Sequence, residues 1–90
     1  MKSKKTKRFD KLFEKLPEDV KEATRKTFKL WLENPFHPSL HFKCIVPSKK
    51  IWSIRITTDY RAIGYKREDI IYWDWIGNHS DYEREIKRRR

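Results

Sequence analysis

Three consecutive stretches decide the fold: Ile51-Trp-Ser-Ile-Arg-Ile-Thr57, Tyr60-Arg-Ala-Ile-Gly-Tyr-Lys66 and Ile70-Ile-Tyr-Trp-Asp-Trp-Ile76. Each is rich in β-branched and aromatic residues, and only a few polar residues separate one from the next. This pattern is typical of antiparallel strands joined by short turns. A fourth strand is expected just upstream, over residues 41–46, before the Pro47-Ser-Lys-Lys50 turn.

The residues before these strands follow the period of a helix instead. Apolar residues recur at i, i+3, i+4 and i+7, as Phe9, Leu12, Phe13 and Leu16. Pro17 ends that first helix and suits the first position of a second, which is expected to run to Glu33 because Asn34 precedes a proline. After the strands, Asn78 or Ser80 is expected to cap a short final helix that runs through Glu83 to Lys87.

The sequence therefore predicts one α+β domain over residues 1–90, with two N-terminal helices packed on a twisted antiparallel sheet of four to five strands and a short C-terminal helix. Trp52, Ile54 and Ile56 share the face expected to meet the helices. Ser53, Arg55 and Thr57 would then lie on an open, basic face suited to a phosphate backbone.

The position of Arg61 depends on the length of the turn before it. A two-residue turn at Thr58-Asp59 would pair Arg55 with Ala62 and would put Arg61 opposite Ile56, on the apolar face. Thr-Asp is not a dipeptide favoured in two-residue hairpin turns, so a longer loop or a bulge would change this register. Both arrangements stay open at this level.

The chain carries 23 Lys and Arg residues against 13 Asp and Glu residues, a formal net charge of +10. This charge favours a polyanionic partner. Most of the excess lies in two terminal segments, 1–8 and 84–90, which are candidate flexible arms. Residues 36–67 form a second basic segment inside the domain.

The same composition excludes several classes of protein. No apolar run is long enough for a membrane-spanning helix, so we expect no membrane partner. The single cysteine, Cys44, excludes an internal disulfide, is expected to be a small core residue, and fits a reducing cytoplasmic compartment. His37, His41, Cys44 and His79 lack the spacing of a structural zinc site, and two glycines do not make a phosphate-binding loop, so neither a metal nor a cofactor is expected.

Metal-free cleavage of RNA by its own 2′-hydroxyl remains possible with the residues present. This reaction needs a base for the hydroxyl proton, cations for the phosphorane charge and an acid for the leaving 5′-oxygen. His79 is the histidine best suited to acid–base chemistry, and Tyr82 follows it by three residues on the same side of a helical turn. The candidate cations for phosphate binding are Arg55, Arg61, Lys43, Lys49 and Lys50.

Purely structural roles compete with these assignments. Arg61 has Asp59 and Asp81 as possible ion-pair partners, and His79 with Asp81 fits a helix cap.

Several motifs, in order along the chain, resemble the RelE/ParE superfamily of bacterial toxins, the toxin halves of type II toxin–antitoxin pairs. The motifs are Leu16-Pro17-x-x-Val20, Asn34-Pro-x-His-Pro-Ser-Leu-x-Phe-Lys43, Trp52-Ser-Ile-Arg-Ile-Thr57, Asp59-Tyr-Arg-Ala-Ile-Gly64 and Trp75-Ile-Gly-x-His-Ser-Asp-Tyr-Glu83. The resemblance covers nearly the whole chain, and it implies a short first strand at about 3–7 that pairs into the sheet.

The resemblance also implies an activity and roles for individual residues. RelE-like members cleave mRNA on the translating ribosome without a metal, and Arg61 occupies the place of their catalytic arginine. His79 resembles the C-terminal histidine of the YafQ and HigB branches, while Arg55 and Lys43 match phosphate-holding cations loosely. The catalytic set implied is His79, Arg61 and Tyr82. This sequence does not closely match the lysine-rich first strand of RelE or the tyrosine near its C-terminus.

The expected partners are mRNA, the ribosome and a small acidic antitoxin, with a free toxin that is monomeric and a complex that is oligomeric. Two other functions stay open. ParE-like relatives share the fold but poison DNA gyrase, and a degenerate toxin would be a non-catalytic binding module. The presence of His79 and Tyr82 favours the ribonuclease.

Overall fold

The computed structural model describes residues 1–90 and has the α+β architecture that the sequence predicts. Five strands form one sheet in the order β1-β5-β4-β3-β2. The strands are β1 Lys2–Lys5, β2 Lys43–Val46, β3 Ile51–Arg55, β4 Tyr60–Arg67 and β5 Ile70–Asn78. The helices are α1 Lys7–Glu14, α2 Glu18–Glu33 and α3 His79–Arg89, with short 3₁₀ turns at Pro38–Leu40 and Pro47–Lys49.

The sheet is mixed, because one of its four strand pairs is parallel and the other three are antiparallel. Strands β2 to β5 pair antiparallel, as expected from their short connections. Strand β1 pairs parallel with β5, from Lys2 opposite Ile70 to Lys5 opposite Trp73. The expected first strand at about 3–7 is therefore present but lies slightly earlier and ends where Thr6 caps α1.

Short-range signals set the helix ends. The Oγ1 atom of Thr6 accepts a hydrogen bond from the Phe9 amide at 3.2 Å, so α1 begins two residues before its first apolar position. Pro17 precedes α2, and Asn34 ends it as expected. Of the two expected caps, Asn78 is the one that begins the C-terminal helix, directly after β5, with its Oδ1 atom accepting from the Asp81 amide at 2.9 Å, and the helix continues past Lys87 to Arg89.

One face of the sheet packs against α1 and α2. Trp31 and Trp73 are fully buried at its centre and contact each other edge to face, with ring centroids 5.7 Å apart. Ile54 and Ile56 lie in this layer, as their alternation predicts. The other members of this core are Phe9, Phe28, Leu40, Phe42, Ala62, Ile71 and Ile76.

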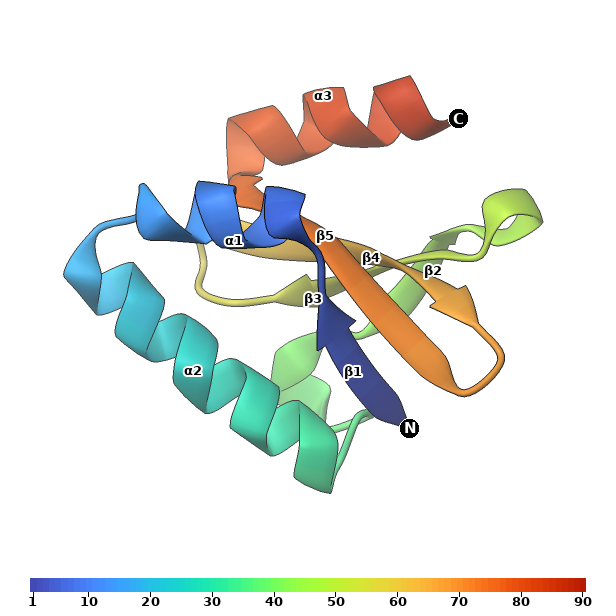
Figure 1. Cartoon of the computed structure of the whole chain (residues 1–90), viewed down its shortest axis with the longest axis horizontal. Helices are drawn as coiled ribbons and strands as arrows, with labels where there is room; N and C mark the ends of the chain where they lie inside the picture. The colour runs from blue at the N-terminus through green and yellow to red at the C-terminus, as the bar shows by residue number, and fades with distance from the viewer.

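The opposite face is covered by α3, and the expectation of an open basic face was wrong there. Figure 1 shows α2 and α3 on opposite sides of the sheet. A second, smaller core lies under α3, made of Val46, Ile51, Ile63, Trp75 and Tyr82. Ser53, expected to face solvent, is only 2% exposed. The sheet therefore has two apolar layers, one on each face, where the sequence led us to expect one.

A bulge in β5 divides its aromatic residues between the two layers. Ile63 of β4 pairs with Trp75, but the next residue, Gly64, pairs with Trp73, so Asp74 is an extra residue in the ladder. As a result, Trp73 enters the core under α1 and α2, whereas Trp75 enters the core under α3. Asp74 reaches toward α3, where it meets Arg89.

Both basic ends of the chain are part of the folded domain. Residues 2–5 form β1, and residues 84–89 belong to α3. The two segments are therefore structural elements instead of flexible arms, and their arginines make specific contacts described below. None of the three helices combines the length and apolar character required to cross a bilayer.

Candidate active site

Arg55 and Arg61 face each other across β3 and β4 at one end of the sheet. Ile56, the residue after β3, still pairs with Tyr60, since its amide donates to the Tyr60 carbonyl at 3.0 Å. The loop between the paired residues therefore has three residues, Thr57 to Asp59. This one extra residue, compared with a two-residue turn, puts both arginines on the face covered by α3. The longer-loop alternative is the one that the structure has.

Loop carbonyls orient the Arg61 side chain. Its Nη1 atom donates to the carbonyl oxygens of Thr57 at 2.6 Å, Thr58 at 3.2 Å and Tyr60 at 3.1 Å. Neither Asp59 nor Asp81 pairs with it. The Nε and Nη2 atoms have no acceptor within the protein, so Arg61 is held in place with two nitrogens available for an anion.

Arg55 is tied to the same loop. Its Nη2 atom donates to Thr58 Oγ1 at 3.1 Å, and its Nη1 atom lies 3.5 Å from His41 Nε2. A cavity of about 500 Å³ adjoins this arginine, and Lys26 and Ser39 are among its other lining residues. Arg55 and Arg61 thus supply two oriented guanidinium groups beside one loop.

His79 begins α3 directly after the strand that pairs with Arg61. Arg61 is opposite Gly77 and Tyr60 is opposite Asn78, so His79 follows at the same end of the sheet. Its side chain is about half exposed, and its Nε2 atom lies 3.4 Å from Glu83 Oε1. Asn78 forms the cap and Glu83 is the carboxylate next to the imidazole, so Asp81 neither caps the helix beside His79 nor pairs with Arg61.

Tyr82 is the buried member of the predicted catalytic set. It is 8% exposed, and its hydroxyl donates to Ser53 Oγ at 3.0 Å. Its ring packs beside Trp75, with centroids 6.4 Å apart, and beside His79 at 6.1 Å. The hydroxyl proton is therefore already engaged inside the second core, and the ring contact helps to set the position of His79.

The predicted lysines divide between the two ends of the sheet. Lys43 pairs with Ser53 at the start of β2 and lines a cavity of about 530 Å³ between β2 and α3, together with Tyr82. Cys44 lines the same cavity and is only half-buried, so it is not the core residue expected. Lys49 and Lys50 lie at the opposite end, in the connection from β2 to β3. They are therefore not neighbours of Arg55 and Arg61, although they belong to the same basic segment.

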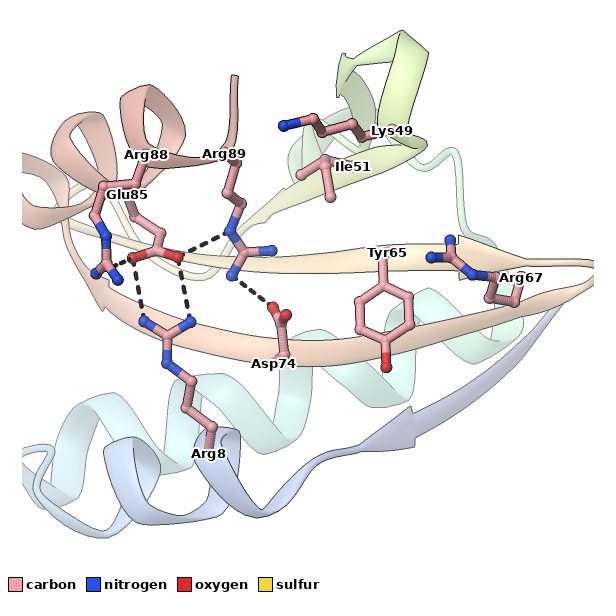
Figure 2. A pocket seen from close by; sticks show the side chains of 9 residues that line it. All are labelled: Arg8, Lys49, Ile51, Tyr65, Arg67, Asp74, Glu85, Arg88 and Arg89. Carbon is pink, nitrogen blue, oxygen red and sulfur yellow. Dashed lines mark hydrogen bonds and ion pairs between the residues drawn. The ribbon is translucent and has the colours of Figure 1, made fainter.

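A charged cluster, which we call the Glu85 cluster, occupies that opposite end of the α3 face (Figure 2). It consists of Arg8, Asp74, Glu85, Arg88 and Arg89. Glu85 accepts two hydrogen bonds from Arg8, at 3.2 and 3.3 Å, one from Arg88 at 3.2 Å and one from Arg89 Nε at 2.9 Å. Arg89 also donates to Asp74 at 2.7 Å.

The cluster changes the acidity of its central carboxyl. Burial raises the pKa of Glu85, but hydrogen bonds from Arg8 and Arg89 and the charges of both outweigh burial and hold the pKa below its ordinary value. This cluster was not predicted from the sequence. The spacing of Glu85 and Arg89, four residues apart and so on one side of a helix, is the sequence signal that could have indicated it.

The sequence matches one known family over most of its length. Residues 18–84 match the family described as "ParE-like toxin domain". No curated protein matches the sequence.

Several solved structures share the fold at low sequence identity. YafQ from Escherichia coli BL21(DE3) is 13% identical with a TM-score of 0.70, over 89% of this chain and 94% of that one. The RelB–RelE antitoxin–toxin complex from Methanococcus jannaschii is 14% identical with a TM-score of 0.73, over 91% of this chain and 96% of that one. The YoeB/ParE toxin from Agrobacterium tumefaciens is 16% identical with a TM-score of 0.67, over 88% of this chain and 99% of that one.

Proposed function

The chain belongs to the ParE-like toxin family of the RelE/ParE superfamily, and we propose that it is a metal-independent, ribosome-associated mRNA endoribonuclease that blocks translation. The observation that carries the proposal is the strand register that puts Arg55, Arg61 and His79 at the same end of the sheet. Two anchored cations and one imidazole are the groups that cleavage by a 2′-hydroxyl requires.

In the proposed reaction, the 2′-oxygen attacks the adjacent phosphorus. The bond from phosphorus to the 2′-oxygen forms while the bond to the 5′-oxygen breaks, which leaves a 2′,3′-cyclic phosphate and a 5′-hydroxyl. His79 carries one of the two proton transfers, since imidazole changes its protonation near neutral pH, and water carries the other. The free Arg61 nitrogens and Arg55 stabilise the charge of the phosphorane, with Lys43 as an auxiliary cation.

Tyr82 enters this proposal as a positioning residue. Its hydroxyl bond to Ser53 and its ring contact with His79 support a role in fixing α3 and the imidazole above the sheet.

Translation-coupled cleavage of a reporter mRNA tests the proposal. We expect Arg61→Ala to reduce the cleavage rate by about a hundredfold to a thousandfold, the usual cost of losing one electrostatic stabiliser of a transition state. His79→Ala should have a loss of at least similar size. Arg25→Ala is the matched control, because Arg25 is an exposed arginine on α2 that pairs with Glu18 and Glu22. Unchanged cleavage and toxicity in both active-site variants would refute the proposal.

Inhibition of DNA gyrase is the second candidate. The family description names ParE, and the structural neighbours include a YoeB/ParE toxin. Supercoiling assays with purified protein separate the two functions, since the proposed endoribonuclease leaves gyrase activity unchanged. Growth arrest on expression distinguishes either toxin from a degenerate module, which would cause none.

A small acidic antitoxin is the proposed protein partner. The RelE neighbour was solved with its antitoxin RelB. In the present chain, an apolar groove of about 470 Å³ runs between α1 and α2, with Phe13, Phe28 and Leu32 among its lining residues and Lys5, Arg25 and Lys29 at its border. Leu32 is 59% exposed. An acidic amphipathic segment has the complementary chemistry, and Leu32→Glu should weaken its binding without reducing cleavage by the free toxin.

A further inference from the structure

We propose that the cavity beside the C-terminal end of α3 is a second phosphate site, which holds the RNA strand about four nucleotides from the scissile phosphate. This proposal rests on the endoribonuclease function proposed above. The cavity has a volume of about 530 Å³, and five of its nine lining residues are basic. Figure 2 shows how Arg89, Lys49, Tyr65 and Arg67 surround the open space next to the Glu85 cluster.

Arg89 is the preorganised donor of this site. Its side chain is 11% exposed, and two carboxylates fix the guanidinium from one side: Nε donates to Glu85 and Nη2 donates to Asp74. The remaining nitrogen, Nη1, has no partner and points toward Tyr65 (Figure 2). A donor already held in position loses little conformational freedom when an anion arrives, which favours binding.

The cavity also has an excess of positive charge. Three arginines of the Glu85 cluster face only two carboxylates. Lys49 makes no ion pair, and Arg67 donates only to the Lys66 carbonyl, at 3.0 Å. These charges leave a net of about three positive charges around the cavity, which attracts an anion rather than a neutral ligand.

Tyr65 makes a nucleic acid the best-suited source of that anion. Its ring stacks on Tyr72, with centroids 5.2 Å apart and planes 12° apart, and the Arg67 guanidinium lies 4.9 Å from its centroid. The stacked pair of Tyr65 and Tyr72, both half-buried and next to cations, is the combination with which proteins bind single strands, since aromatic rings pack on bases while cations hold phosphates. An acidic peptide would use the cations and leave the ring without a role.

The site lies on the same face as the candidate active site, at a separation that a short strand of RNA spans. His79 and Arg89 are the first and last residues of α3, and ten helical rises of 1.5 Å separate them by roughly 15 Å. Along β4, Arg61 and Tyr65 share this face and are four residues apart, or roughly 13 Å. At about 3.4 Å per stacked nucleotide, four nucleotides cover this distance.

Binding of non-cleavable RNA tests the site separately from catalysis. The probes are a 2′-O-methyl trinucleotide and a 2′-O-methyl heptanucleotide, which lack the attacking hydroxyl. The test variant is Lys49→Gln with Arg67→Gln, because both side chains are exposed and outside the Glu85 cluster. Lys11→Gln with Lys15→Gln removes the same charge as a control, because both lysines are exposed, at the C-terminal end of α1, and neither lines the cavity.

We expect the test variant to bind the heptanucleotide roughly tenfold more weakly than the wild type, with the slope of log affinity against log salt reduced by about 0.7 for each phosphate that is no longer neutralised. Trinucleotide binding should be nearly unchanged, and the control variant should behave like the wild type. Equal heptanucleotide binding by the two variants would overturn the proposal.

Two further probes identify the source of the anion. If inorganic phosphate binding depends on Lys49 and Arg67 while heptanucleotide binding does not, the site takes free phosphate and the proposal is wrong. If the test variant weakens binding of a polyglutamate peptide but not of the heptanucleotide, the site takes an acidic protein and the proposal is also wrong. Reporter cleavage by His79→Ala is measured alongside. Its outcome decides the endoribonuclease function, whereas the binding series decides the second phosphate site.

Discussion

Tyr82 on α3 donates its hydroxyl proton to Ser53 on β3 over 3.0 Å, inside the layer where the C-terminal helix meets the sheet. Both residues are buried, Tyr82 at 8% and Ser53 at 2% exposure. This bond joins the helix that begins with His79 to the strand that ends with Arg55. The relative position of the proposed proton-transfer group and one proposed cation therefore depends on it.

Tyr82→Phe removes this bond and keeps the ring. We expect a loss of unfolding free energy of about 1 kcal/mol, because Ser53 loses its partner in a buried site. We also expect the cleavage rate to fall by less than about tenfold, since the ring still contacts His79 and the cost of one hydrogen bond is small. Urea unfolding and reporter cleavage measure the two effects. A loss of rate of about a hundredfold at unchanged stability would instead assign Tyr82 to the chemical step.

Thr58→Val tests whether the loop orients Arg55. The change removes the hydroxyl that accepts from Arg55 Nη2 and leaves the Thr58 carbonyl that accepts from Arg61. RNA binding should weaken by roughly threefold to tenfold, or about 1 kcal/mol, the net value of one hydrogen bond at an exposed position. Thr58→Ser, which keeps the hydroxyl, is the control in the same binding assay. If both variants bind equally, Arg55 does not depend on this contact.

Glu85→Gln should destabilise the protein by about 3 kcal/mol at neutral pH, since three arginines lose the charge that they share. The pKa of Glu85 is held below its ordinary value of 4.5, so its contribution to stability is complete above about pH 4.5. That contribution is lost as the pH falls through the lowered pKa.

The free energies of unfolding of wild type and Glu85→Gln should therefore converge in acid. Urea titrations at a series of pH values from neutral to about pH 3 measure this difference. A constant difference over the whole range would show that the carboxylate charge is not what stabilises the cluster.

Gly64→Ala should cost about 2 kcal/mol of unfolding free energy, in the range of other overpacked cores. A Cβ atom at this position would lie 2.7 Å from the Tyr72 carbonyl oxygen and 2.9 Å from a methyl carbon of Ile71. The backbone oxygen belongs to the neighbouring strand and cannot move without breaking the ladder. Thermal unfolding checks this, and a melting temperature equal to that of the wild type would contradict it.

The sequence predicted the elements that depend on the local repeat of apolar residues and on residues that end a helix, such as proline. The stripe from Phe9 to Leu16, the stop at Asn34 and the inward face of Trp52, Ile54 and Ile56 are all present. It also predicted Arg55, Arg61 and His79 as candidates for phosphate binding and proton transfer, and the fold brings them to one end of the sheet. The family suggested by the motifs is the one that the comparisons show.

The features that could not be predicted depend on register and on long-range pairing. The turn before Tyr60 has three residues instead of two, and that single residue decides which face Arg61 occupies. The helix α3 continues to Arg89, past the expected end at Lys87, and it is held by contacts with other elements: Arg89 with Asp74 of β5, and Glu85 with Arg8 of α1. No local pattern records such partners, so the second core under α3 was missed with them.

The bulge at Asp74 has a consequence for how this chain tolerates insertions and deletions. Trp73 and Trp75, two residues apart, enter different cores because one extra residue shifts the alternation of β5 between them. A point substitution at Asp74 keeps that shift. Deletion of the residue would restore regular alternation and turn half of the strand over, exchanging its side chains between the two cores. The number of residues in β5 at this point, more than the identity of the side chain at position 74, therefore decides which residues enter each core.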